Sequence, residues 1–332
     1  MKIHALAANN KQEELINFDY ETNSNLPHDC IVKVQTCGIC HSDIHMIDND
    51  WRISKYPLVP GHEVVGIVEE VGGLVNHLKV GDRVGIGWQS EACLECRDCL
   101  RGNENLCNSS KATIVGRHGG FGSHVQVDSR FCFKIPDSLE SAIASPLLCA
   151  GITVYSALRY AGMSSGQNIG IIGIGGLGHL AVQFAAKLGN RVTVFTTSPD
   201  KEEFARSNGA TEVIIGTPPR KIKDKLNIIL NTTHNDLDWV RFLSLLDSDG
   251  TLSFVGVPPS NLSNIHVNML LNKRLRIMGS PIGGRAMINE MLEIAALQGI
   301  TPVIEKFPAT KVNEAIAKVR ANQVRYRAVL EF

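Results

Sequence analysis

The stretch NIGIIGIGGLG, residues 168–178, decides the fold of this 332-residue chain. Its opening residues predict a buried strand, Asn168–Ile172. The glycine pattern G-x-G-x-x-G follows at once and opens a stretch of helical periodicity that stops at Gly189. This context predicts a dinucleotide-binding loop, because glycine lets the backbone approach a pyrophosphate at a helix N-terminus; a tight turn without a ligand is the alternative. The loop residues are Gly173, Ile174, Gly175, Gly176, Leu177 and Gly178.

Beyond this loop, apolar strands alternate with helical segments. The further strands that we expect are Arg191–Thr196, Thr211–Ile215, Leu226–Leu230 and Gly250–Val255. Buried strands that alternate with helices predict a parallel, doubly wound sheet. Toward the end of the chain we expect helices over Ala286–Gln298 and near Val312–Arg320, and a final strand, Arg325–Glu331.

The end of the second strand lacks the acid that usually distinguishes an NAD-binding site. Such sites place Asp or Glu about 20 residues after the loop, where it holds the ribose hydroxyls. This chain has Thr196, Thr197 and Ser198 there, with Lys201 shortly after. Hydroxyls and a lysine suit a 2′-phosphate, so we expect NADP rather than NAD. Ser198 precedes Pro199 and is also a good helix N-cap, and a helix cap binds phosphate by the same physics.

The first part of the chain, to about residue 145, predicts a mostly β domain. The strands that we expect there are Cys30–Thr36, Val64–Val71, Asp82–Ile86 and His124–Val127. The 33 basic and 33 acidic residues balance, which gives no electrostatic reason to expect nucleic acid or a membrane surface as partner. We see neither a secretory signal nor an uninterrupted apolar run of membrane-spanning length. We therefore expect a cytoplasmic protein, in which cysteines bind metal more often than they form disulfides.

Four of the nine cysteines lie in one short loop with the spacing C-x2-C-x2-C-x7-C. They are Cys93, Cys96, Cys99 and Cys107. Four thiolates at this spacing predict a closed, tetrahedral zinc site, which stabilises a loop and leaves no position open for chemistry. A ferredoxin-like cluster shares the first two spacings but has its fourth cysteine after three residues. Four unrelated buried thiols are the other alternative.

A second set of metal-binding residue types is dispersed along the chain. Cys40 precedes a short polar segment, His62 and Glu63 follow a Pro-Gly pair, and Cys149 lies where the composition changes. Spacing alone does not join these residues, and Cys37 competes with Cys40 as a candidate.

Several segments, in order along nearly the whole chain, together resemble the zinc-containing medium-chain dehydrogenases, and most of all their cinnamyl alcohol dehydrogenase branch. They are CGICHSDIH (37–45), PLVPGHEVVGIV (57–68), the four-cysteine loop, PLLCAGITVY (146–155) and GIGGLGH (173–179). The resemblance implies an α/β protein with a GroES-like, mostly β zinc catalytic domain over residues 1–146 and 286–332. It implies a Rossmann NADP-binding domain over 147–285, with the active site in the cleft between the domains.

The same resemblance implies the activity. It indicates a zinc-dependent, NADP(H)-linked alcohol dehydrogenase, or aldehyde reductase, that interconverts aldehydes and primary alcohols by hydride transfer. It also implies a homodimer formed through Leu275–Ser280, with a tetramer as the alternative.

Family roles carry over to matching positions of this sequence. Cys40, His62 and Cys149 match the catalytic zinc ligands, and Glu63 matches a transient ligand behind the metal. Asp43 matches the carboxylate that orients the histidine ligand. Ser42 and His45 match a proton relay, although His45 would also fit a solvated loop.

Further positions match the family's cofactor contacts and substrate pocket. The cofactor positions are the loop Gly173–Gly178 together with Thr153, Thr196, Thr197, Ser198, Lys201, Thr232, Gly256, Ser280 and Ile282. Candidate pocket walls are Trp51, Leu58, Trp88, Pro281 and Ile282. Plant cinnamyl enzymes often carry an aromatic residue at the Pro281 position, and this departure favours a broad aldehyde reductase.

Two rival functions stay open at this point. An NAD-linked polyol or secondary-alcohol dehydrogenase commonly has an acid in place of one catalytic cysteine and a second acid after the second strand. A non-catalytic NADPH-binding sensor would be expected to have lost a ligand or a relay residue. This chain retains Cys149 and the other ligand positions, which favours the enzyme.

Overall fold

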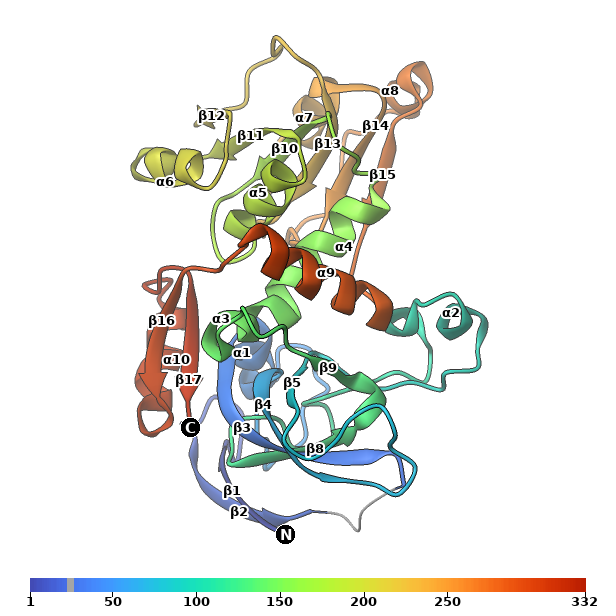
Figure 1. Cartoon of the computed structure of the whole chain (residues 1–332). Coiled ribbons are helices and arrows are strands. Elements are labelled where there is room, and N and C mark those ends of the chain that lie inside the picture. The colour runs from blue at the N-terminus through green and yellow to red at the C-terminus, as the bar shows by residue number, and fades with distance from the viewer. Residues whose placement is uncertain (23–26) are drawn as a thin grey trace. The chain divides into compact units, whose positions relative to one another are not determined.

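The structure is a computed structural model that describes residues 1–22 and 27–332. These residues divide into two compact units, whose elements are labelled in Figure 1. The first unit contains Met1–Cys149 and Gly283–Phe332, and the second contains Ala150–Ile282.

In the described part of the chain, the second unit is built on a six-stranded sheet. The strand order is β12-β11-β10-β13-β14-β15, and every neighbouring pair is parallel. The strands are β10 (Asn168–Ile172), β11 (Arg191–Thr196), β12 (Glu212–Ile215), β13 (Leu226–Asn231), β14 (Leu246–Phe254) and β15 (Arg276–Gly279). This is the order of a Rossmann sheet, in which the direction of progression reverses beside the first strand. The predicted doubly wound parallel sheet is confirmed.

The helices of the second unit are α4 (Ile152–Tyr160), α5 (Gly178–Lys187), α6 (Glu202–Ser207), α7 (Trp239–Leu245) and α8 (Val267–Lys273). Helix α4 precedes the first strand of this sheet, and the other helices of the second unit lie between its strands in the sequence. Helix α5 begins at the last glycine of the predicted loop, and all its residues from Gly178 to Ala185 are buried. Because side chains on every face of this segment are buried, α5 is an internal helix.

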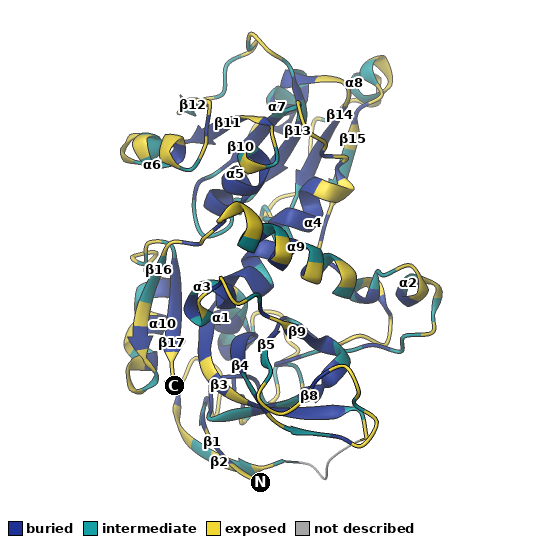
Figure 2. Cartoon of the chain, viewed as in Figure 1, coloured by how far each residue is buried: buried dark blue, intermediate teal, exposed yellow. Residues whose placement is uncertain are grey.

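The first unit contains a mostly antiparallel sheet around the long strand β3 (Asp29–Ile39). Its described residues form the path β16-β17-β3-β4-β5-β9, and β8 pairs with β3. The other strands are β4 (Glu63–Val71), β5 (Arg83–Ile86), β8 (His124–Asp128), β9 (Cys132–Lys134), β16 (Ile304–Pro308) and β17 (Arg327–Glu331). Strands β1 (Lys2–Ala7) and β2 (Ile16–Glu21) form a hairpin, and β6 (Gln89–Glu91) pairs with β7 (Lys111–Ala112). The interior of this β unit is buried (Figure 2).

Short helices complete the first unit. They are α1 (His41–Asp48), α2 (Arg97–Leu100), α3 (Ser141–Pro146), α9 (Arg285–Gln298) and α10 (Val312–Arg320). Helix α1 follows β3 directly and therefore begins at the end of the unit's central strand.

One long helical segment was not foreseen from the sequence. Helix α3, a π-helical turn (Leu147–Gly151) and α4 follow one another without a break. Among the described residues, Ser141–Tyr160 is the one helix long and apolar enough to cross a membrane, with a mean hydropathy of 1.5. Because 78% of that window is buried inside the protein, we interpret the segment as a core helix.

Candidate functional site

Four side chains from three separate parts of the sequence meet in the first unit. Cys40, His62, Glu63 and Cys149 each offer one ligand atom, and these atoms all lie within 4.8 Å of one another. Cys40 directly follows β3 and is the N-cap of α1, while Glu63 begins β4 and His62 directly precedes it. Cys149 lies in the π-helical turn, a feature that often occurs at functional sites. Cys37, the competing candidate, is outside this group; its thiol donates instead to the Gly38 carbonyl oxygen.

The separations within this group fit a tetrahedral zinc ion. Zinc binds thiolate sulfur at about 2.3 Å and imidazole nitrogen at about 2.1 Å, so tetrahedral angles place two sulfurs about 3.8 Å apart and sulfur and nitrogen about 3.6 Å apart. The Cys40 and Cys149 sulfurs are 3.9 Å apart, and His62 Nε2 lies 3.4 Å from the Cys149 sulfur. Among the described residues, Glu63 Oε2 is buried and has no hydrogen-bond partner. A cation beside Oε2 would give this buried oxygen a partner.

Proton sharing between the two thiols prepares the site for a cation. A hydrogen bond from the Cys149 thiol holds the pKa of Cys40 well below its usual value. The same hydrogen bond, together with burial, raises the pKa of Cys149. One thiolate is therefore favoured before any metal binds, and the metal has to displace the remaining thiol proton.

Asp43 is the organising carboxylate of the site. It is fully buried, and its Oδ1 lies 2.9 Å from His62 Nδ1. It also accepts hydrogen bonds from the backbone N–H groups of Cys40 and Gly61, each at 2.9 Å. The bond to Nδ1 leaves Nε2 of His62 free to face the thiols, which is the orientation that a metal ligand needs.

Sequence reasoning missed a buried arginine beside these groups. Arg327, at the start of β17, forms an ion pair with Glu63, and the two side chains are only 7% and 0% exposed. Antiparallel pairing of β17 with β3 places Ala328 opposite Ile39, which brings Arg327 next to Cys40. Burial raises the pKa of Glu63, and the positive charge of Arg327 opposes this rise. A local motif could not reveal this pair, because the two residues are joined only by sheet pairing.

The predicted relay residues Ser42 and His45 both lie on α1. The Ser42 hydroxyl is 3.6 Å from the Cys40 sulfur. His45 lies one turn further along the same helix face, and its Nδ1 is 2.7 Å from Asp50 Oδ2. Sequence reasoning did not include Asp50. Its carboxylate fixes the orientation of the His45 ring, which is partly exposed.

Two of the candidate pocket walls border the group and one does not. The Trp88 ring meets the His62 ring edge-on at 5.0 Å, and Trp51 meets Trp88 at 5.8 Å. The site therefore has an aromatic border within the first unit. Leu58 is 2% exposed and belongs to the hydrophobic core instead.

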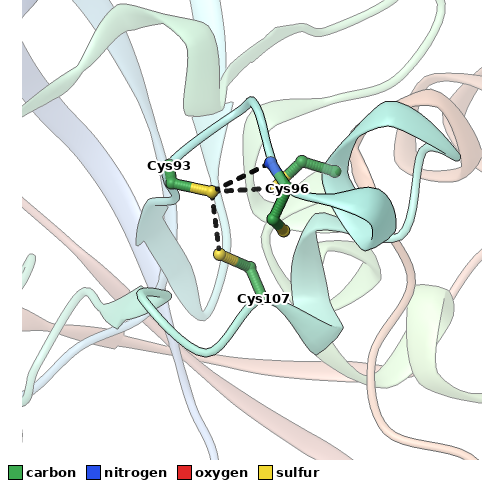
Figure 3. Close-up of side chains that lie close together, drawn as sticks. Cys93, Cys96 and Cys107 are labelled. Atoms are coloured by element: carbon green, nitrogen blue, oxygen red, sulfur yellow. Dashed lines mark hydrogen bonds between the residues drawn. The ribbon is translucent and has the colours of Figure 1, made fainter.

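The ligand atoms of the four loop cysteines lie within 4.8 Å of one another. Figure 3 shows three of them, Cys93, Cys96 and Cys107. The Cys93 sulfur lies 3.9 Å from that of Cys99 and 3.5 Å from that of Cys107, near the spacing expected around zinc. Backbone N–H groups of Glu95 and Cys96 lower the pKa of Cys93 to about 7, which favours the thiolate that a metal needs. All four ligand positions are thiols, so this site would be closed.

The glycine loop has the shape that a dinucleotide requires. Gly173 has φ of +87°, and a Cβ on Gly178 would collide with the Gly173 carbonyl oxygen. A Cβ on Gly175 would meet no described atom within 4 Å, so the backbone there is open to a ligand. The Thr232 hydroxyl donates to the carbonyl oxygen of Ile172 at 2.8 Å and closes one side of the loop. The loop lies beside the reversal in strand order, where such folds bind nucleotides.

Nearly all the predicted cofactor residues follow carboxyl ends of parallel strands and therefore share one edge of the sheet. The glycine loop follows β10, and Thr196 is the last residue of β11, with the segment to Lys201 directly after it. Thr232 follows β13, Gly256 follows β14, and Ser280 and Ile282 follow β15. Thr153 is the exception, because it lies on α4. Ser198 occupies the N-cap position before Pro199, but its side chain makes no capping hydrogen bond. Its backbone N–H instead donates to the Thr196 hydroxyl at 3.2 Å.

A Rossmann sheet, a β unit and two thiol-rich groups that could each hold a metal ion are the features of a zinc-containing dehydrogenase. Residues 26–137 match the alcohol dehydrogenase GroES-like domain, and residues 176–297 match the zinc-binding dehydrogenase family. The chain belongs to the zinc-containing alcohol dehydrogenase family.

Individual relatives resemble it over their whole length. An aldehyde reductase from Synechocystis sp. is 41% identical over 99% of this chain and 98% of the relative. A cinnamyl alcohol dehydrogenase structure from Sorghum bicolor superposes with a TM-score of 0.91 at 35% identity, over 100% of this chain and 98% of that one. A Helicobacter pylori cinnamyl alcohol dehydrogenase solved with NADP(H) gives 0.90 at 30% identity, with the same coverage.

Proposed function

We propose that the chain is an NADP(H)-linked, zinc-dependent alcohol dehydrogenase that reduces aldehydes to primary alcohols and catalyses the reverse reaction. The observation that carries this proposal is the convergence of Cys40, His62, Glu63 and Cys149 at one point, with Ser42 beside them. The names of the similar proteins support both the aldehyde substrate and the cofactor.

Each residue of the site has a chemical task in this proposal. Cys40, His62 and Cys149 would hold the zinc, which supplies a Lewis acid for the substrate oxygen. The Ser42 hydroxyl donates a proton to that oxygen in the reducing direction. His45, held by Asp50, passes the proton between Ser42 and solvent. NADPH, when bound, supplies the hydride.

The cofactor preference rests on the end of β11. Thr196 ends this strand, Thr197 and Ser198 follow, and no carboxylate occupies the strand end. Lys201 lies on the short 3-10 turn that Ser198 begins. We assign the 2′-phosphate to these hydroxyls and this lysine, because a carboxylate in their place would repel it.

We assign the catalytic domain to the first unit and the nucleotide-binding domain to the second unit. We assign a structural zinc to the four-cysteine loop.

A homodimer through β15 is part of the proposal, because within the described chain this strand has a partner on one side only. Light scattering should then give twice the chain mass of 36.2 kDa. A cytoplasmic location agrees with nine free cysteines, all within the described residues.

The test is a panel of aliphatic and aromatic aldehydes and the matching alcohols, assayed by cofactor absorbance with NADPH and with NADH. We expect turnover of several aldehydes with NADPH, and its loss in Cys149→Ser. If the protein instead oxidises polyols or secondary alcohols, and does so with NAD in preference to NADP, the result would support an NAD-linked polyol or secondary-alcohol dehydrogenase. Tight NADPH binding without turnover of any substrate would support a sensor.

A further inference from the structure

One buried carboxylate ties the four-cysteine loop to the start of α9. Glu104 lies between the third and fourth cysteines, and its side chain is 7% exposed. Its Oε2 accepts a hydrogen bond from the Arg285 backbone N–H at 3.0 Å, and its Oε1 lies 3.5 Å from the Arg285 guanidinium. Gly284, the N-cap residue of α9, has no side chain to cap the helix. A carboxylate from the loop therefore caps this helix, where its charge also favours the helix dipole.

The approach of loop and helix is close at this point. A Cβ on Gly284 would collide with the carbonyl oxygen of Gly102 and would lie 2.7 Å from Glu104 Oε2. Only glycine fits between the loop and the helix without a shift of the backbone. The backbone of the four-cysteine loop is therefore in close contact with Gly284, the residue that precedes α9.

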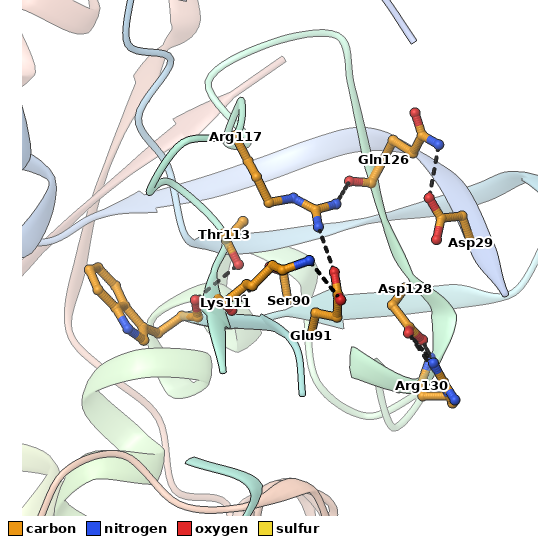
Figure 4. A network of polar contacts seen from close by, with 10 residues as sticks. Asp29, Ser90, Glu91, Lys111, Thr113, Arg117, Gln126, Asp128 and Arg130 are labelled. Carbon is orange, nitrogen blue, oxygen red and sulfur yellow. Dashed lines mark hydrogen bonds and ion pairs between the residues drawn. The ribbon is translucent and has the colours of Figure 1, made fainter. Parts of the chain in front are cut away.

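The contacts of Glu104 with Gly284 and Arg285 form a junction between the four-cysteine loop and α9. Arg285 connects this junction to a third segment of the chain. Its Nε donates to the Arg130 carbonyl oxygen at 2.8 Å, and its guanidinium lies 5.5 Å from the centroid of the Phe131 ring. Arg130 is itself held by Asp128, whose Oδ1 accepts from Arg130 Nε at 2.9 Å (Figure 4). Three segments thus converge at Arg285, and Glu104 is the carboxylate that pairs with its guanidinium.

The junction stands where the chain leaves the second unit. That unit ends at Ile282, and α9 begins at Arg285. The residues just before the junction, Ser280–Ile282, are among those predicted to contact the cofactor. Ser280 is hydrogen-bonded in the second unit, through its N–H to the Phe254 carbonyl oxygen at 3.0 Å. Two residues, Gly283 and Gly284, separate this predicted cofactor segment from the helix start that Glu104 holds.

We propose that Glu104 is a positioning residue for dinucleotide binding, through which the four-cysteine loop holds the segment Ser280–Ile282 in place. This inference rests on the proposed function, because it assumes that the second unit binds a nicotinamide dinucleotide. Glu104 is flanked by Cys99 and Cys107, so its position depends on closure of the loop around those thiols. The loop then acts on cofactor affinity as well as on stability.

The test uses the zinc-loaded full chain and three variants. Glu104→Ala removes the cap and the charge, Glu104→Gln keeps an acceptor oxygen, and Glu95→Ala removes an exposed carboxylate from the same loop as the matched control. Four quantities are compared: zinc content, melting temperature, the Kd of NADPH, and backbone amide exchange over residues 280–287. Turnover at saturating substrate is measured beside them.

We expect Glu104→Ala to weaken NADPH binding by about fivefold or more relative to Glu95→Ala, which corresponds to the loss of one charge-assisted hydrogen bond. Amide exchange over residues 280–287 should be faster, while kcat and zinc content are kept. Glu104→Gln should recover part of the affinity. If Glu104→Ala does not fold, Glu104→Gln carries the comparison.

Equal NADPH affinity in Glu104→Ala and Glu95→Ala overturns the inference, and so does unchanged amide exchange. Loss of zinc together with parallel losses of kcat and affinity also overturns it, since a purely structural role predicts that pattern. If the unaltered chain prefers NADH, the same comparison is made with NADH. If it binds neither dinucleotide, the proposed function fails as well, and this is seen before any variant is compared.

Discussion

Arg327 and Glu63 bring two opposite charges, both out of water, to the group of metal-binding side chains. Removing one partner of such a pair leaves the other buried and unpaired, at a cost of about 3–5 kcal/mol, whereas removing both costs much less. We predict that Arg327→Met lowers the free energy of unfolding by this amount, and that adding Glu63→Gln restores most of it. Denaturant unfolding measures both.

Arg274→Met serves as the control for this experiment. Arg274 is 79% exposed and pairs with Asp249 at the surface, where an ion pair contributes little. Equal destabilisation by Arg274→Met and Arg327→Met would show that the buried pair has no special cost.

The preference for NADPH over NADH depends on a few residues at the end of β11. Hydroxyls at the end of β11 and the charge of Lys201 should favour NADPH over NADH by about 100-fold in kcat/KM, or a few kcal/mol. Thr197→Asp combined with Lys201→Ala should narrow or reverse this ratio and leave the zinc content unchanged. Steady-state kinetics with NADPH and with NADH measure this kcat/KM ratio in the unaltered enzyme and in the variant. An unaltered enzyme that uses both cofactors equally would contradict the assignment of the 2′-phosphate.

Some individual residues could be identified from the sequence and others could not. Ser42 and Asp43 adjoin Cys40, so a match to one motif found all three. Arg327 became visible only when β17 was seen to pair with β3, because no short-range pattern links the end of the chain to its central strand. Asp50 follows α1 and looks like a surface acid until its contact with His45 is known.

At the scale of the elements, the two cysteine sets should behave differently on mutation. Binding of zinc to a structural site is folding free energy, on the order of 10 kcal/mol in small zinc peptides. We predict that Cys93→Ser lowers the melting temperature strongly, while Cys149→Ser abolishes activity and largely keeps the fold. Thermal unfolding and the aldehyde assay measure the two effects. Equal melting temperatures in both variants would contradict the division into structural and catalytic sites.

Elements with a clear pattern were predicted closely, and the long helical segment Ser141–Tyr160 was not. Strands β10 and β11 have the predicted bounds, because a continuous apolar run between turn signals leaves little ambiguity. Helix α10 also matches, since its apolar residues recur on one face. The segment Ser141–Tyr160 shows no such face, because most of it is buried. Pro146 within it also argues against a helix when only the sequence is available.

For the whole molecule we predict two zinc ions per chain. The motivation is the pair of separate ligand groups in the described residues, one of four thiols and one of mixed type. Elemental analysis of protein purified without added metal should show this number, and Cys149→Ser should reduce it to one. A value near one zinc ion per chain in both the unaltered protein and Cys149→Ser would show that the group containing Cys149 binds no zinc.

The spread of the ligands along the chain has a consequence for biosynthesis. A nascent chain emerges from the ribosome at about 5–20 residues per second, N-terminus first. The cysteines of the four-cysteine loop emerge close together and can capture their ion early, whereas Cys149 follows later and Arg327 later still. Until Arg327 emerges, the carboxylate of Glu63 has no arginine partner. We therefore expect a ribosome-bound chain stalled before β17 to hold one zinc firmly and to exchange the other.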